Sequence, residues 1–130
     1  MGTSVQLRVF PSDCPPAQAM DHIGPICRLI EADTPASADF INHIVLYPKR
    51  KWKAHELCSA HGLSVTLNVE DAKRIRRRVG RLGNCRIAVG ILDGTQGKVA
   101  QTGVHTEHHT WWPEDTTQFL EVFASSEVIP

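Results

Sequence analysis

The chain of 130 residues contains 14 basic and 14 acidic residues, and 42% of its residues are hydrophobic. Such a length and composition are typical of one globular domain with a buried core, which we place at residues 1–130. No stretch approaches eighteen consecutive apolar residues, and the N-terminus lacks a basic segment followed by an apolar run. We therefore expect no transmembrane helix, no membrane partner and no secretion signal, and predict a soluble cytoplasmic protein.

The cysteine spacing matches no known motif, whereas the charges are distributed unevenly along the chain. Cys14, Cys27, Cys58 and Cys85 follow no Cys-x-x-Cys or zinc-ribbon spacing, which predicts four separate thiols in a reducing compartment, with a disulfide pair as the alternative. Residues 49–86 hold eleven basic and three acidic residues, a formal charge of +8, and the rest of the chain carries −8. This asymmetry indicates a surface for a polyanion or an acidic partner, unless the basic face neutralises the protein's own acidic segments.

The N-terminal third is predicted to contain a strand and two or three helices. Residues 5–9 alternate apolar and polar side chains, as a strand does. Apolar residues at helical spacing predict a helix over residues 17–30, kinked or divided at Gly24-Pro25 because proline lacks an amide hydrogen. Ser37 is a candidate N-cap for a further helix over residues 38–47.

The middle of the chain gives the clearest helical pattern. The basic run at 51–53 surrounds Trp52, and a short helix over residues 54–61 is expected to end at Gly62. Asn68 is a candidate N-cap for a helix over residues 68–82, with acids in its first turn and arginines near its end. An apolar stripe at spacings of three and four predicts its buried face: Val69, Ala72, Ile75, Val79 and Leu82.

The C-terminal third is predicted to be mainly β-structure. Residues 86–92 and 98–102 read as two strands joined by the turn "DGTQG", which together predict a β-hairpin. A further strand and a short helix over residues 117–123 are expected beyond it. Trp111 and Trp112 are interpreted as core anchors or interface aromatics rather than as a platform for stacking bases.

The order helix, extended run, helix, helix and hairpin over residues 37–103 resembles a winged helix-turn-helix domain. The resemblance implies an α+β fold with a three-helix core and a β-hairpin wing. Residues 1–36 and 104–130 would be strand and helix extensions that complete the core or build a homodimer interface. It also implies that "NVEDAKRIRRRVGRL" lies in the major groove of duplex DNA, while "DGTQGK" forms the tip of the wing.

Charge supports the same hypothesis independently of the resemblance, because cations that contact phosphates release counterions and arginine grips phosphate or guanine bidentately. We expect a DNA-binding protein, a transcriptional regulator or mobile-element factor of bacterial type, with duplex DNA as its partner. The predicted nucleic-acid-binding residues are Lys51, Lys73, Arg74, Arg77, Arg78, Arg81 and Lys98.

Two other functions are consistent with the sequence. In the first, the same basic face docks on an acidic protein, with Trp111 and Trp112 as hot spots. In the second, a metal-dependent hydrolase or nuclease uses the histidine cluster, with His105, Glu107 and His109 on one strand face and His108 on the other. We favour exposed histidines on a polar strand over a metal site. No nucleophile elbow or phosphate-binding glycine loop is present, so we expect no cofactor and lean against an enzyme.

Overall fold

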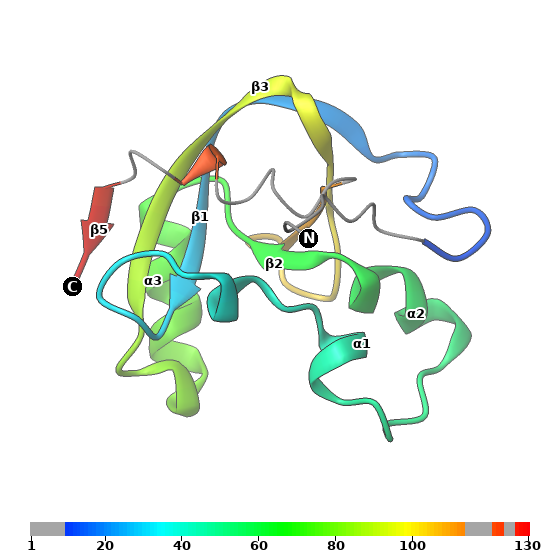
Figure 1. Ribbon diagram of the computed structural model, residues 1–130, viewed down its shortest axis with the longest axis horizontal. Coiled ribbons are helices and arrows are strands. Elements are labelled where there is room, and N and C mark those ends of the chain that lie inside the picture. The colour runs from blue at the N-terminus through cyan, green and yellow to red at the C-terminus, as the bar shows by residue number, and fades with distance from the viewer. Residues whose placement is uncertain (1–9, 114–120, 124–126) are drawn as a thin grey trace, which may run out of the picture.

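The computed structural model describes residues 10–113, 121–123 and 127–130, and its centre is a five-stranded antiparallel sheet (Figure 1). The strand order is β1-β3-β4-β2, and β5 pairs with the first half of β3. The strands are β1 (Met20–Ile30), β2 (Leu63–Val65), β3 (Arg86–Gln101), β4 (His109–Trp112) and β5 (Glu127–Ile129).

The sheet curls round and closes on itself. β3 pairs with β1 along most of its length and with β4 at its end, and β4 pairs with β2. Thr66, one residue beyond β2, then exchanges two backbone hydrogen bonds with Cys27 of β1, at 2.8 and 2.9 Å. This pairing brings the two ends of the strand order together and satisfies backbone groups that an open edge would leave unpaired.

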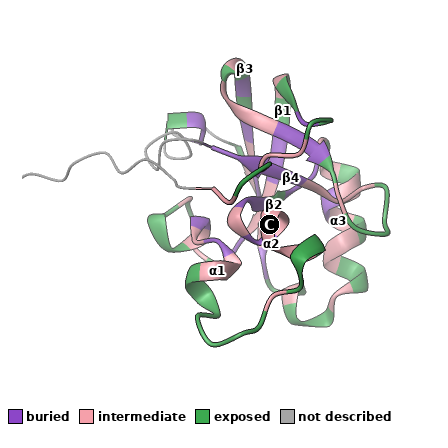
Figure 2. Ribbon diagram, turned by 90° about the vertical axis from the view of Figure 1, so that its right-hand side faces the viewer, coloured by how far each residue is buried: buried purple, intermediate pink, exposed green. Residues whose placement is uncertain are grey.

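The closed sheet encloses the main hydrophobic core (Figure 2). Alternate residues of the strands point inward, among them Ile26, Leu92 and Trp111, each at most 1% exposed. Phe40 and Phe123 join the same cluster, with ring centroids 5.1 Å apart. The expectation that the tryptophans are core anchors is confirmed, since Trp112 is also 1% exposed and packs in a second buried cluster.

The helices lie outside the sheet. They are the 3-10 turns η1 (Ser37–Phe40) and η2 (Gly80–Leu82) and the α-helices α1 (His43–Leu46), α2 (Ala54–His61) and α3 (Val69–Arg78). Among the described residues, only α2 and α3 are α-helices of seven or more residues, so the predicted winged helix with its three-helix core is wrong. The expected helix over residues 38–47 is instead η1 and the single turn α1, separated by the extended residues Ile41 and Asn42.

Residues 20–30 form β1 and not the predicted helix. Pro25 is accommodated because the amide of Cys27, two residues on, points toward Thr66 and away from β3. The nitrogen of Pro25 therefore points to the same side, where no strand pairs with it, and its missing hydrogen removes no ladder bond. The apolar residues of this segment follow helical spacing by chance, and antiparallel pairing with β3 makes the segment a strand.

The predicted hairpin is also wrong, because residues 86–101 form one continuous strand. Asp93 is opposite Ile23 of β1, and Lys98 is opposite Asp21 of the same strand, so β1 continues across the "DGTQG" segment. The extra residues of β3 are absorbed as an irregularity in which the Asp93 carboxylate accepts hydrogen bonds from Thr95 at 2.6 and 2.8 Å. The glycine-rich segment therefore bends a strand rather than reversing it.

The predicted end of one helix and the predicted N-cap of another are confirmed. α2 covers residues 54–61 and is followed by Gly62 as its C-cap. Asn68 caps α3, where its side-chain oxygen accepts the amide of Asp71 at 2.8 Å. α3 ends four residues earlier than predicted, at Arg78, and η2 follows it.

A disulfide joins Cys14 to Cys58, so the expectation of four separate thiols is wrong. Cys27 and Cys85 are free and buried. Nothing in the cysteine spacing pointed to this pair, because residues 14 and 58 are brought together only by the fold. Among the described residues, no helix combines the length and apolar character needed to cross a membrane. The strand expected at residues 5–9 lies outside the described residues, as does most of the helix expected at 117–123.

Candidate functional site

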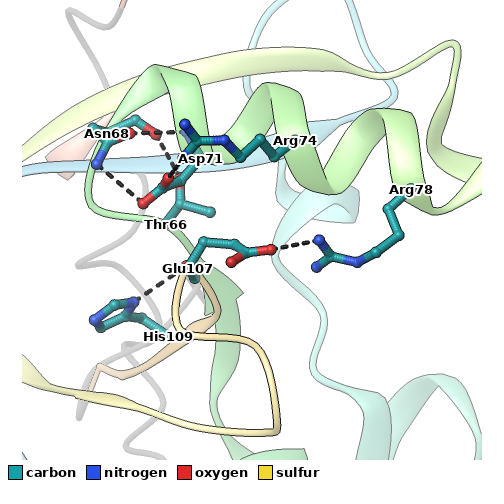
Figure 3. A network of polar contacts seen from close by, with 7 residues as sticks. All are labelled: Thr66, Asn68, Asp71, Arg74, Arg78, Glu107 and His109. Atoms are coloured by element: carbon teal, nitrogen blue, oxygen red, sulfur yellow. Dashed lines mark hydrogen bonds and ion pairs between the residues drawn. The ribbon is translucent and has the colours of Figure 1, made fainter.

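Three of the six cations of the predicted recognition helix form ion pairs within the protein, and Figure 3 shows two of these pairs. Arg74 pairs with Asp71 one turn earlier at 2.7 Å, and Lys73 lies 3.7 Å from Glu70. Arg78 reaches across to Glu107 in the segment before β4. The alternative that the basic face neutralises the protein's own acids therefore applies to these three residues.

The remaining predicted binding residues do not form one surface with them. Lys98 lies on β3 and pairs with Asp21 of β1 at 3.1 Å. α3 packs on β1 at Cys27, which is six residues further along that strand, so Lys98 lies away from α3. Lys51 is exposed between α1 and α2. Arg77 and Arg81 are exposed, and neither has an ion-pair partner among the described residues.

The histidine cluster is not the regular strand that the sequence predicts. Residues 102–108 form bends and turns, and β4 begins only at His109. The Glu107 carboxylate accepts a hydrogen bond from the guanidinium of Arg78. The backbone amide of Glu107 and this guanidinium both lower the pKa of the carboxyl group. His109 is hydrogen-bonded through Nδ1 to the carbonyl of Glu107, and His105 is exposed. Within the described ranges, no group of three or more His, Cys, Asp or Glu side chains is placed to hold a metal ion.

The structure contains a cavity of about 760 Å³ that the sequence did not reveal. Its floor is formed by residues of β1 and β2 and by Thr66. One wall comes from α3 and η2, and the other from the segment that contains η1 and α1. Most of the wall is apolar, from Leu29, Ala36, Ala38, Ile41, Leu46, Val65, Ala72, Ile75, Val79 and Leu82. The polar and charged lining includes Arg28, Glu31, Asp39, His43, Tyr47, Ser64, Thr66, Arg81 and His108.

A chain of hydrogen bonds ends at Ser64 in this cavity. Nδ1 of His108 lies 3.2 Å from the carbonyl oxygen of Thr102 and 2.9 Å from its hydroxyl, while Nε2 lies 3.1 Å from Oγ of Ser64. In the tautomer with the hydrogen on Nδ1, the ring donates to the Thr102 carbonyl, which only accepts, and Nε2 accepts from the serine hydroxyl. Burial lowers the pKa of His108, which is consistent with this neutral ring.

His43 is at the centre of an aromatic and cationic group beside the cavity. Its ring is stacked with Trp52, with centroids 6.3 Å apart and an interplanar angle of 9°, and Tyr47 meets it edge-on at 5.6 Å. The guanidinium of Arg50 covers the other ring of this stack, 4.1 Å from the centroid of Trp52. Tyr47 lines the cavity and is 46% exposed, so one of its surfaces is open to a ligand.

Charges of both signs act on the groups that line the cavity. Burial lowers the pKa of His43, and Arg28 and Arg81 lower it further. Burial raises the pKa of Cys85, and Glu31 and Asp39 add to that rise, while Arg81 and Arg76 oppose it. The Asp39 carboxylate is engaged by the amides of Glu31 and Ala36, at 2.9 and 3.1 Å. The charged side chains that act most strongly on His43 are therefore arginines.

Arg28 ties the floor of the cavity to its wall. Its Nε donates to the carbonyl of Asp39 and its Nη1 to that of Ser64, both at 2.7 Å. Its guanidinium also lies 5.7 Å from the centroid of the Phe40 ring. These contacts fix a positive charge between η1 and β2.

Sequence reasoning found only Arg81 among the cavity's charged residues. Arg28 was missed because β1 was predicted to be a helix, and Ser64 because no pattern marks a three-residue strand. The stretch from His43 to Lys53 did carry a signal, since it interleaves aromatic and basic residues in the way that surfaces for single strands do. Comparison with protein-family models, curated proteins and solved structures finds no match to this chain.

Proposed function

We propose that the protein binds single-stranded nucleic acid, with one nucleotide in the cavity. The observation that carries the proposal is the set of aromatic and basic side chains in the cavity: the half-exposed Tyr47 ring meets His43 edge-on, and Arg28 and Arg81 line the same space. Single-strand sites combine aromatic rings that stack on bases with cations that hold the phosphates. The cavity offers the first through Tyr47 and the second through Arg81.

The charged segment beside the cavity extends the proposed site. Lys49, Lys51 and Lys53 are exposed, and Trp52 between them stacks on His43. Phosphates on either side of the bound nucleotide would meet these lysines. Duplex DNA is a weaker proposal, because the described residues form no winged helix and three of the five cations of α3 are paired with acids of the protein. An acidic protein partner would use the same exposed cations but would not need Tyr47.

Fluorescence anisotropy with a labelled single-stranded 12-mer, in RNA and DNA forms, tests the proposal. Tyr47→Ala should weaken binding by about 5- to 150-fold, which corresponds to the ~1–3 kcal/mol of one base stacked on one aromatic ring. Arg81→Gln should lower affinity and reduce the salt slope by about 0.7 for one lost phosphate contact. Lys73→Gln is the matched control, because Lys73 is paired with Glu70 and lies outside the cavity.

Two results would overturn the proposal. One is the absence of binding to either 12-mer at low salt. The other is binding that prefers a duplex of the same sequence and that falls with Lys73→Gln as much as with Arg81→Gln, which would return the site to the face of α3.

The disulfide bears on where such binding would take place. Disulfides persist mainly in oxidising compartments, so we infer that Cys14–Cys58 favours an oxidising environment over the cytoplasm expected from the sequence. The count of free thiols in protein isolated without reductant tests this inference: two thiols per chain support it, and four contradict it.

A further inference from the structure

We infer that Ser64 is a nucleophile that takes a phosphoryl group from an ester bound in the cavity, with His108 as its general base. The inference stands on the hydrogen-bonded chain that runs from Thr102 through His108 to Ser64. The identity of the ester, a phosphodiester of single-stranded nucleic acid, rests on the proposed function.

The arrangement has the three parts that an activated serine requires: a nucleophile, a base in hydrogen-bond reach and a group that orients the base. Oγ of Ser64 is 3.1 Å from Nε2 of His108. The carbonyl of Thr102 can accept a hydrogen from Nδ1, and in that tautomer Nε2 is free to accept a proton. The Thr102 hydroxyl is itself held by Thr110 at 2.7 Å, and Thr110 is 1% exposed, so the orienting group is fixed to the sheet.

Ser64 is also placed where a substrate could meet it. Ser64 is the exposed residue of β2, between the buried Leu63 and Val65, and it lines the cavity. The Arg28 guanidinium donates to the carbonyl of this same residue, and Arg81 lines the same cavity. Two arginines therefore line the cavity that holds Oγ, and positive charge there stabilises the negative charge that a phosphoryl group carries during attack.

The step balances without a metal, oxidant or reductant. The Ser64 hydroxyl gives its proton to Nε2 of His108 while Oγ forms a bond to phosphorus. The bond between phosphorus and the departing nucleotide oxygen breaks, and that oxygen takes the proton from Nε2 and leaves as an alcohol. Water then reverses these roles: it gives a proton to Nε2, bonds to phosphorus and displaces Ser64, which recovers its proton.

Diisopropyl fluorophosphate tests the nucleophile directly, because it transfers a phosphoryl group to activated serines. Incubation of the full chain should add one diisopropylphosphoryl group, and peptide mapping of the wild-type protein should place it on Ser64. His108→Gln should slow the labelling about 100-fold, as expected for the loss of a general base. The variant's thermal unfolding is measured in parallel, and the single-stranded 12-mer should slow labelling of the wild type.

The outcomes separate the two proposals. Absence of label on Ser64, or equal labelling of several exposed serines such as Ser37, overturns the nucleophile and leaves nucleic-acid binding standing if the 12-mer still binds. Label on Ser64 that the 12-mer does not slow overturns the phosphodiester as its substrate. Because the map is made on the wild-type chain, a His108→Gln variant that fails to fold does not remove the test.

Discussion

At the scale of single residues, burial and neighbouring charge decide what the groups of the cavity can do. His43 lies among cations and has a lowered pKa, so at neutral pH its ring is uncharged and can stack on Trp52 and meet Tyr47. A bound phosphate would add negative charge to the cavity, and would make it easier for His43 to take a proton.

His43 should make the folding stability depend on pH. Its pKa in the unfolded chain is about 6.5, and its pKa in the folded protein lies lower. Below pH 6.5 the unfolded chain therefore binds a proton that the folded state does not, and stability falls as the pH falls. Urea denaturation at pH 7 and pH 5 should show a smaller loss for His43→Gln than for the wild type. A loss of equal size in both proteins would contradict the lowered pKa.

At the scale of elements, the sequence predicts helix ends correctly where a neighbouring residue in the chain caps the helix. Asn68 and Gly62 predicted a start and an end because capping depends only on neighbours in the chain. The apolar stripe predicted for residues 69–82 is only partly buried. Ala72 is buried and packs against Cys27 and Ile87, while Val79 and Leu82, beyond the end of α3, are half-buried and line the cavity. An apolar stripe in the sequence predicts which face of a helix is turned away from water, but it does not predict which part of the protein covers that face.

Asn68→Ala should destabilise the protein by about 1 kcal/mol, because the Asp71 amide would lose its side-chain acceptor at the N-terminus of α3. Asn68→Ser keeps an acceptor at this position without placing a second carboxylate beside Asp71, and should retain most of the stability. Equilibrium urea denaturation of the three proteins measures both effects. An alanine variant as stable as the wild type would show that the cap is not a significant contribution.

At the scale of the whole molecule, the sequence could not predict closure of the sheet. The closing contact joins Cys27 to Thr66, and the disulfide joins Cys14 to Cys58, so both link segments that are far apart in the chain. The cavity depends on this closure, because it brings β1 against β2 and so places Arg28 beside Ser64. The residues of the site come from five segments, and no local pattern shows which of them meet.

Reduction of the disulfide should lower the stability by about 2–4 kcal/mol, because the reduced unfolded chain gains conformational freedom over the loop between residues 14 and 58. Thermal unfolding with and without a phosphine reductant measures the change. The double variant Cys14→Ser with Cys58→Ser should match the reduced wild type and should not respond to reductant. If the reductant lowers the melting temperature of this double variant equally, the effect does not come from the disulfide.

The binding of a single strand in the cavity is tested most directly by nuclear magnetic resonance of the histidine rings. His43 lines the cavity and His55 is exposed on α2 outside it, so the two rings serve as site and control. Saturation with a single-stranded hexanucleotide should shift the ring signals of His43 and raise its pKa, because a phosphate would offset the cations Arg28, Arg81 and Arg50 that lower it. The signals of His55 should stay in place. Unchanged signals and an unchanged pKa for His43 in a protein saturated with the hexanucleotide would contradict the account, because the strand would then be bound elsewhere.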